Sequence, residues 1–414
     1  MQRGKVMKHP YLNMGVGIYL SYLLLGMVNI ILASNMSFLS ERMGVIRTDI
    51  SLLISIVGIG HLLTINIAGK LSDRYGRKPL LISAAILYTV FLIGMPMTTH
   101  FTLAMFFALF AGVSNSLLDA SSYPALNEGF KEAAGTATVL IKAFMSIGAA
   151  ILPVLIAFLI SQDMFFGYAF FLPAILFIVL GIYFIPVRFP AVNGEERNEE
   201  IDKENVEKQE SNPHSWKEGT AIVFIGFSAV SMTVVIQTWL PTFGQEIIHL
   251  NENNAVKLLS FYSVGGLISV LLLAWLLKRI IKPITAMVIT PIAAAIFVIA
   301  LLFARDASLV PFIAFFLGLS TSGIYQLAMA VMMQMFPNNK GVSVSYVSAA
   351  ASVAFMVIPY ITGLLIKHIG IFSVFYLELA ITIVSTVLAI YLSRKIKLFS
   401  KIYQRDKKYK LKTM

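Results

Sequence analysis

The sequence predicts an all-α membrane protein with twelve transmembrane helices, arranged as two six-helix, pseudo-symmetric halves. Three observations lead to this fold class. The 414 residues are 58% hydrophobic and 13% charged, whereas soluble domains are nearer half apolar and a quarter charged. Apolar runs that are about long enough to cross the ~30 Å hydrocarbon core recur along the whole chain. A long stretch of the first half also recurs, without a gap, in the second half.

The apolar runs predict helices joined by short polar loops, with one long polar segment between the halves. Residues 188–215 are rich in Glu, Asn and Lys and lack apolar periodicity, so they predict a flexible linker. The chain then divides into a half at 1–187, the linker, a half at 216–393 and a basic tail at 394–414. The approximate spans are 12–35, 48–69, 79–98, 101–123, 134–160, 165–187, 217–240, 255–277, 283–303, 308–335, 341–366 and 371–393.

The positive charges predict the orientation. Of the 32 Lys and Arg residues, 26 fall in the loops and tails on one side of these spans and five on the other, while Lys142 falls inside a span. Cytoplasmic loops of membrane proteins carry an excess of Lys and Arg, so we expect both termini and the linker to be cytoplasmic. We expect the chain to be a multi-pass protein of the plasma (bacterial inner) membrane. The first apolar run is too long for a signal-peptide core and is expected to be retained. The three tryptophans, Trp239 among them, fall near span ends and are expected at the membrane interface.

An internal repeat supports the two halves. When the sequence is shifted by 206 residues, the stretch 112–159 matches 318–365 without a gap. The matched positions include Gly112 with Gly318, Phe130 with Phe336 and Pro153 with Pro359. Parallel repeats of this kind are known in transporters. The small-residue spacings Gly112-x-x-x-Ser116 and Gly318-x-x-x-Ser322 predict close helix packing.

The loop between the second and third spans, from Gly69 to Pro79, reads Gly-Lys-Leu-Ser-Asp-Arg-Tyr-Gly-Arg-Lys-Pro. It resembles the signature loop of the major facilitator superfamily, Gly-x-Leu-x-Asp-Arg-x-Gly-Arg-Lys/Arg, at every fixed position. Gly69 and Gly76 are expected to permit the tight reversal. The resemblance implies twelve helices and alternating-access transport.

The resemblance also implies a gating role for this loop. Asp73 is expected to contact the start of the helix near Gly341 in one conformation and to release it in the other, because a helix N-terminus attracts a carboxylate. Arg74 and Arg77 are expected to order the loop and, with the basic tail, to meet anionic lipid. Two departures argue against multidrug efflux. Ala108 stands where many members of the family carry an Arg, and the glycines of the drug-antiporter pattern are absent around Pro153.

Three charged residues fall well inside the predicted spans: Asp119, Lys142 and Glu378. Intramembrane charges are costly and usually functional. Asp119 and Lys142 lie on neighbouring helices and are predicted to pair, either for coupling and substrate binding or only to fix two helices. Glu378 is expected to have a structural or snorkelling role, with Lys367 or His368 as its partner.

Further polar candidates lie on other spans. Asn115 shares a helical face with Asp119, and Tyr325 occupies the position that the repeat aligns with Asp119. Asn29, His61 and Gln237 are candidates for substrate contact, although each alone is more often a satisfied interhelical hydrogen bond. Histidine is the side chain that most readily gains and loses a proton near neutral pH, so His61 is also a candidate for proton binding.

These features predict a secondary active transporter of a small organic solute that works by alternating access, coupled to protons. The alternative is a proton-coupled multidrug or metabolite efflux antiporter, and a third class is a membrane sensor or lipid-translocating protein. No phosphate-binding loop is present, so we expect neither an enzyme nor direct use of ATP. We expect a monomer with no cofactor. The absence of cysteine removes thiolate metal sites, and we expect no metal. The basic charge is an orientation signal, and we expect no nucleic-acid partner.

Overall fold

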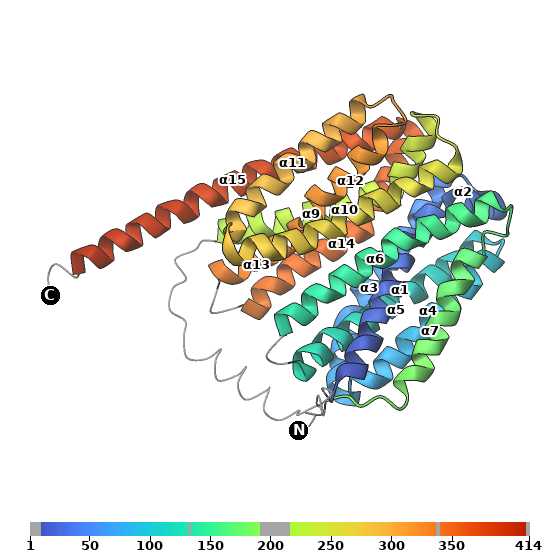
Figure 1. Ribbon diagram of the computed structural model, residues 1–414, viewed down its shortest axis with the longest axis horizontal. Helices are drawn as coiled ribbons and strands as arrows, with labels where there is room; N and C mark the ends of the chain where they lie inside the picture. The colour runs from blue at the N-terminus through green and yellow to red at the C-terminus, as the bar shows by residue number, and fades with distance from the viewer. Residues whose placement is uncertain (1–9, 131–133, 191–215, 337–339, 411–414) are drawn as a thin grey trace, which may run out of the picture.

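The computed structural model describes residues 10–130, 134–190, 216–336 and 340–410, and in this part of the chain the elements are helices (Figure 1). The polar linker 188–215 falls almost entirely outside the described residues. The first bundle comprises α1 (Leu12–Ser34), α2 (Met36–Met43), α3 (Arg47–Tyr75), α4 (Arg77–Met97), α5 (Phe101–Gly129), α6 (Ala134–Ser161) and α7 (Tyr168–Phe184). The second comprises α9 (Trp216–Glu246), α10 (Glu252–Arg279), α11 (Pro283–Phe303), α12 (Val310–Thr321), α13 (Ile324–Met335), α14 (Lys340–His368) and α15 (Ile371–Lys410).

Within the described ranges, eleven helices are long and apolar enough to cross a membrane, and α12 with α13 counts as one of them. The 17-residue apolar helix α7 supplies a shorter twelfth. The predicted spans agree with these helices to within a few residues at most ends. α3 and α15 are longer than predicted, because each helix continues through polar residues beyond its apolar run.

One predicted span is divided. The run 308–335 forms α12 and α13, which are separated at Ser322 and Gly323. Gly323 is therefore the site of a break in a transmembrane helix, and such discontinuous helices often surround transport sites. Trp239 also differs from its prediction, because it is fully buried and donates a hydrogen bond of 2.8 Å from Nε1 to Thr362. Since α9 extends to Glu246, Trp239 lies two turns inside the helix and not at an interface.

The two bundles meet along α3 with α14, α6 with α10 and, to a lesser extent, α1 with α9. We call the end of the molecule at which α5 ends and α1, α6, α9 and α14 begin the terminal end, and the opposite end the far end. At the far end, Arg47 donates a 2.7 Å hydrogen bond to Gln245 across the bundles. Nearer the middle, the Ser260 hydroxyl donates to the Ala150 carbonyl at 2.8 Å.

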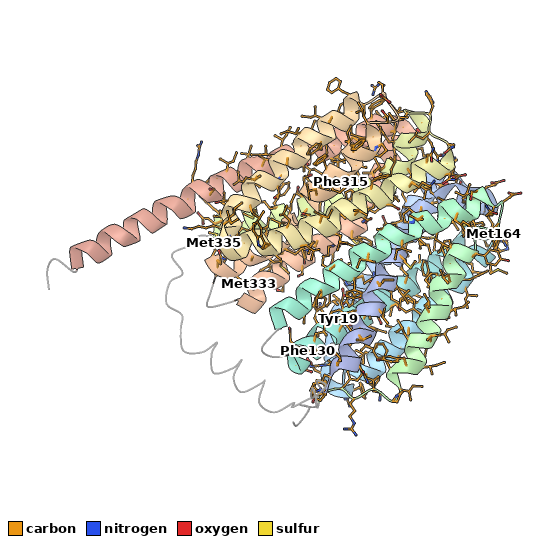
Figure 2. All side chains as sticks on the ribbon, viewed as in Figure 1. Tyr19, Phe130, Met164, Phe315, Met333 and Met335 are labelled. Atoms are coloured by element: carbon orange, nitrogen blue, oxygen red, sulfur yellow. The ribbon has the colours of Figure 1, made fainter. Side chains whose placement is uncertain are left out.

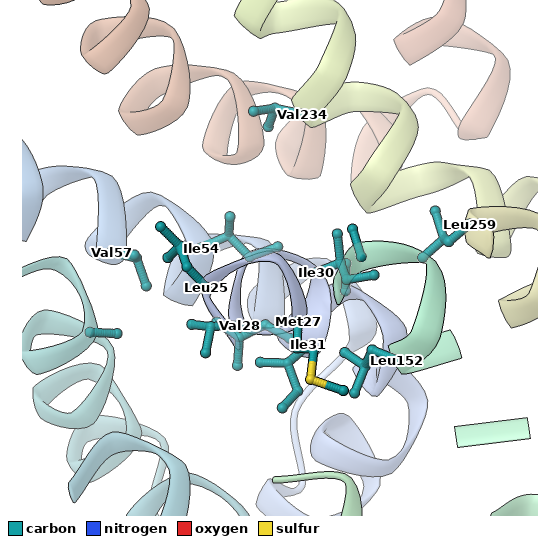
Figure 3. Packing of buried hydrophobic residues seen from close by; sticks show 14 of the residues in the cluster. Leu25, Met27, Val28, Ile30, Ile31, Ile54, Val57, Leu152, Val234 and Leu259 are labelled. Atoms are coloured by element: carbon teal, nitrogen blue, oxygen red, sulfur yellow. The ribbon is translucent and has the colours of Figure 1, made fainter. Parts of the chain in front are cut away.

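The closest approach of α3 and α14 is near Gly58. A Cβ added at Gly58 would lie 2.7 Å from the Met356 Cα, so the absence of a side chain lets the two backbones touch. Figure 3 shows the neighbouring core, where residues of α1 such as Leu25 and Ile30 lie between the first bundle and Val234 and Leu259 of the second. The two bundles therefore share one apolar core in this region.

Toward the terminal end the ribbons of the two bundles diverge (Figure 1). Gly69 of α3 has open space around the position where a Cβ would stand, and Asn66 is exposed. On α14, Ser345 and Tyr346 are exposed as well. The side chains labelled in Figure 2 give the orientation: Tyr19 and Phe130 lie in the first bundle toward the terminal end, and Met164 lies at the far end. The two bundles are therefore in contact at the far end and diverge toward the terminal end.

The repeat is visible in the backbone. Gly112 lies against the Val57 carbonyl of α3, and its counterpart Gly318 lies against the Tyr262 carbonyl of α10, so both small residues permit close helix packing. Phe130 and Phe336 end their helices with nearly the same dihedral angles, φ −122° and ψ 51° against φ −123° and ψ 66°. The gapless alignment therefore corresponds to similar helix packing and helix ends in the two halves, although α5 is continuous and its counterpart is divided into α12 and α13.

Candidate functional site

Asp119 is the centre of a polar cluster in the first bundle, about midway along the spans. The Tyr22 hydroxyl of α1 donates a 2.6 Å hydrogen bond to its Oδ1. His61 of α3 places Nε2 3.5 Å from its Oδ2, a contact that becomes an ion pair when the imidazole is protonated. The side chains of His61 and Asp119 are 22% and 31% exposed. The carboxylate is therefore held by two proton-bearing groups and still reaches open space.

Tyrosines surround this carboxylate. Tyr88, Tyr123 and Tyr325 each interact with it electrostatically. Tyr88 also donates a 2.8 Å hydrogen bond to Asn115, which lies one turn before Asp119 on α5. Tyr325 belongs to α13, so it brings a hydroxyl from the second bundle toward the acid of the first.

Local packing fixes the position of His61. The Ser116 hydroxyl of α5 donates to the His61 carbonyl at 2.8 Å, and Thr64 donates to Ser116 at 2.9 Å. Close contact between Gly60 and Gly112 brings α3 and α5 together at the same level. Backbone proximity, produced by small residues, thus sets the distance between the imidazole and the carboxylate.

The predicted pair of Asp119 and Lys142 is not formed in this conformation. Among the residues that the structure describes, the recorded partners of Asp119 are Tyr22 and His61, and Lys142 has no ion pair. Lys142 lies on α6 at the level where Tyr19 of α1 stacks on Phe144. Sequence neighbourhood suggested the pair, but helix rotation decides which faces meet, and α5 turns Asp119 toward α1 and α3.

The other two polar candidates lie apart from this cluster. Asn29 lines a small cavity with Ile54, Val57 and Phe355, between α1, α3 and α14. Gln237 is half-buried on α9. In the described part of the chain, no hydrogen bond is recorded for either side chain. Of the predicted candidates, the structure therefore brings together Asp119, His61, Asn115 and Tyr325.

The signature loop is shorter than predicted. α3 continues to Tyr75, so Gly69 lies inside a helix, and the reversal takes place at Gly76, whose φ of 89° favours glycine. Asp73 is exposed and accepts a 2.7 Å hydrogen bond from Arg77. Its predicted partner near Gly341 falls among residues 337–344, whose placement or side chains lie outside the described part.

Arg77 does not meet lipid, contrary to the prediction. Its side chain is 2% exposed and donates to Ser72 and, at 2.8 Å, to Glu128 in the last turn of α5. The arginine therefore joins α3, α4 and α5 at the terminal end. A basic loop predicts solvated side chains, but Glu128, a carboxylate distant in the sequence, pairs with Arg77 and allows its burial. Arg74 is exposed and lies over the Tyr75 ring.

Glu378 also differs from its prediction. It is completely buried in α15 and accepts a 2.8 Å hydrogen bond from Ser231 of α9. In the described residues it has no ion pair with Lys367 or His368. The Glu378 carboxylate therefore does not snorkel to the membrane surface, and in the described structure it does not pair with Lys367 or His368 at the far end.

Sequence reasoning missed the tyrosines of the site. Tyr123 stands four residues after Asp119, on the same helical face, so its position was a usable signal. Tyr22 and Tyr88 come from other helices, and no local pattern places them near Asp119.

Comparison with known proteins agrees with this architecture. A family model described as "Major Facilitator Superfamily" matches residues 18–315 and 286–407. The chain is 43% identical to the uncharacterized MFS-type transporter YfkL of Bacillus subtilis (strain 168), across 91% of this chain and 94% of that protein. It is 34% identical to the inner membrane transport protein YdiN of Escherichia coli (strain K12), across 94% and 92%.

Solved transporters share the fold. The D-xylose-proton symporter superposes with a TM-score of 0.75 at 13% identity, covering 92% of this chain and 97% of the symporter. The nucleoside transporter NupG superposes with a TM-score of 0.73 at 13% identity, covering 92% and 99%. Two sets of membrane helices, the signature loop and these matches lead to one conclusion: this chain belongs to the major facilitator superfamily and is a multi-pass membrane transporter.

Proposed function

We propose that this transporter moves a small organic solute by alternating access and couples that movement to protons at Asp119. The observation that carries the proposal is the contact of Asp119 with Tyr22 and His61, at a partly exposed position within the first bundle. Intramembrane carboxylates commonly mark proton relays. Here an imidazole stands within reach to accept or return the proton.

The surroundings of Asp119 support a solute site. Hydroxyls and rings of Tyr123 and Tyr325, which are not fully buried, offer hydrogen bonds and flat apolar faces, the mixture typical of small-molecule sites. Lys142, which has no ion pair among the described residues, supplies a positive charge in the same bundle for an anionic group of the solute. Because Tyr325 comes from the second bundle, its electrostatic contact with Asp119 links the site to the relative position of the bundles.

The proposed orientation places the terminal end in the cytoplasm of a bacterial cell, so this conformation faces inward. Alternating access then requires the far-end contacts, such as Arg47 with Gln245, to open while the terminal end closes. Asp73 of the signature loop is proposed to favour the closed terminal end. Transport of a small solute does not need a cofactor, and we propose that the monomer is sufficient.

The test uses proteoliposomes that contain a pH-sensitive dye and receive candidate sugars, carboxylates and cationic dyes from outside. We expect one class to change the internal pH in the wild type and not in Asp119→Asn. Asp163→Asn is the matched control, because Asp163 is an exposed far-end acid and its left-handed backbone tolerates Asn. Solute entry without proton movement, or proton movement that survives Asp119→Asn, would disprove coupling at this site. The sign of the pH change distinguishes solute–proton symport from efflux by antiport.

A further inference from the structure

The second bundle buries a carboxylate that the proposed transport site does not use. Glu378 lies two turns into α15, and its side chain is 0% exposed. Ser231 donates to Oε2 at 2.8 Å, while Oε1 has no hydrogen-bond partner in the described structure. An ionised carboxylate with an unmatched oxygen in such a place is strongly unfavourable, whereas a carboxylic acid needs only one acceptor for its proton.

Among the residues that the structure describes, Glu378 has no ion pair with a positive charge. The helices that pack on α15 are α9, α11 and α14. α11 contains no titratable side chain. Over their full lengths, the described titratable residues of α9 and α14 are Lys217, Glu218, Glu246, Tyr346, Tyr360, Lys367 and His368. The phenol of Tyr262, on α10, interacts electrostatically with Glu378. A neutral acid fits this environment, and an ion does not.

Further unmatched hydroxyls accompany Glu378 between α9 and α15. Ser228 Oγ and Ser385 Oγ are buried and have no partner in the described structure. Ser231 contacts Glu378 near the middle of this antiparallel pair, and Glu218 contacts Lys395 at 3.6 Å near its terminal end. Ser228 lies about one turn from Ser231 along α9, and Ser385 lies about two turns from Glu378 along α15, so both serines lie on the terminal-end side of the acid. Buried polar atoms without protein partners are commonly completed by ordered water.

The cluster reaches the broken helix of the second bundle. The Tyr262 hydroxyl lies 2.9 Å from the Thr321 hydroxyl, at the end of α12, and Thr233 and Ser322 also approach it. A change in the angle between α12 and α13 is therefore expected to alter the position of the Tyr262 phenol. This arrangement connects the acid with the part of the bundle where a transmembrane helix is discontinuous.

We propose that Glu378 is a second proton-binding site, held as a neutral acid and exchanging its proton with water between α9 and α15. In the exchange, the acid O–H bond breaks, the proton passes to a water molecule, and the carboxylate that remains keeps the hydrogen bond from Ser231. This site is separate from Asp119, and it stands whether or not Asp119 couples transport.

Infrared spectroscopy of the purified protein tests the protonation state without a transport substrate. We expect the carbonyl band of a protonated carboxylic acid at neutral pH, its loss in Glu378→Gln and its retention in Asp119→Asn. The band should weaken as the buffer becomes alkaline. Its absence from the wild type at neutral pH, or its persistence in Glu378→Gln, would overturn the proposal. Removal of the band by sodium chloride at constant pH would also overturn it, because the acid would then bind a metal cation. If Glu378→Gln does not fold, Ser231→Ala serves instead, and we expect a shift in the frequency of the band.

The exchange route has its own test. After transfer to deuterated buffer, the band of the wild type should shift as the acid proton exchanges. Ser228→Ala and Ser385→Ala should slow this shift, whereas Ser55→Ala, which removes an equally buried and unmatched hydroxyl from α3 of the other bundle, should not. Equal rates in all four proteins would overturn the route through α9 and α15.

Discussion

The buried guanidinium of Arg77 donates a 2.8 Å hydrogen bond to the carboxylate of Glu128. The two residues come from the start of α4 and the end of α5, so this one contact ties together two helices at the terminal end. A basic residue of the signature loop is therefore part of the core of the first bundle.

Glu128→Gln should weaken this junction. The substitution removes the charge and leaves Arg77 with Asp73 as its remaining carboxylate, so we expect a loss of about 1.5–3 kcal/mol, as for hydrogen bonds to charged groups. The unfolding temperature of the purified protein in detergent measures the effect. Arg74→Gln is the control, because Arg74 is exposed in the same loop and should change stability by less than about 0.5 kcal/mol. Equal unfolding temperatures for both variants would contradict the structural role of Arg77.

Gly112→Ala should destabilise the first bundle, while Gly69→Ala should not. A Cβ at Gly112 meets the Val57 carbonyl, so α3 and α5 must move apart, at a cost of about 1–3 kcal/mol. Gly69 has open space and lies within α3, where Ala is the better helix former by about 1 kcal/mol. Thermal unfolding compares the two variants directly. If Gly69→Ala proves as damaging as Gly112→Ala, then Gly69 acts in another conformation, as the signature loop first suggested.

Tyr22→Phe should slow proton-driven transport. The Tyr22 hydroxyl donates to Oδ1 of Asp119, so its removal takes away one of the two contacts that hold this carboxylate. A hydrogen bond to a charged group is worth about 1.5–3 kcal/mol, so we expect the rate to fall by about tenfold or more. The measurement is the rate of proton-driven accumulation in proteoliposomes. Tyr183→Phe, which removes a hydroxyl bonded to the Asn13 carbonyl, should leave the rate unchanged. An unchanged rate in Tyr22→Phe would show that the contact between Tyr22 and Asp119 does not act in transport.

The orientation can be tested with single cysteines, because the native chain has none. A membrane-impermeant thiol reagent should label Asp163→Cys at the far end in intact cells. It should label Lys282→Cys, in the loop between α10 and α11 at the terminal end, only after the membrane is permeabilised. The opposite pattern would mean that the termini lie outside.

The sequence was sufficient to predict the helices, because hydrophobic length is set by the bilayer. The predicted span 283–303 coincides with α11, and 134–160 differs from α6 by one residue. The predicted repeat also appears in the packing of Gly112 and Gly318. Helix length and the packing of two helices joined by a short loop depend on nearby residues, so patterns in the local sequence are enough to predict them.

The partners of the charged side chains could not be predicted from local sequence patterns. Asp119 was expected to contact Lys142 and instead contacts Tyr22 and His61, because the rotation of α5 is set by its packing against α3. Arg77 and Glu128 are 51 residues apart in the chain, and their contact depends on how three helices meet. The division of 308–335 at Gly323 was missed for another reason: the run stays apolar on both sides of the break.

The touching backbones at Gly58 and Met356 have a mechanical consequence. If α3 rocks against α14 about this point, the contact acts as a fulcrum. Eleven residues separate Gly58 from the far-end start of α3 at Arg47, and 17 separate it from Tyr75. At 1.5 Å per residue, the two lever arms are about 17 Å and about 26 Å long. One rotation therefore displaces the terminal end about 1.5 times as far as the far end, so the bundles separate more widely at the terminal end than they do at the far end.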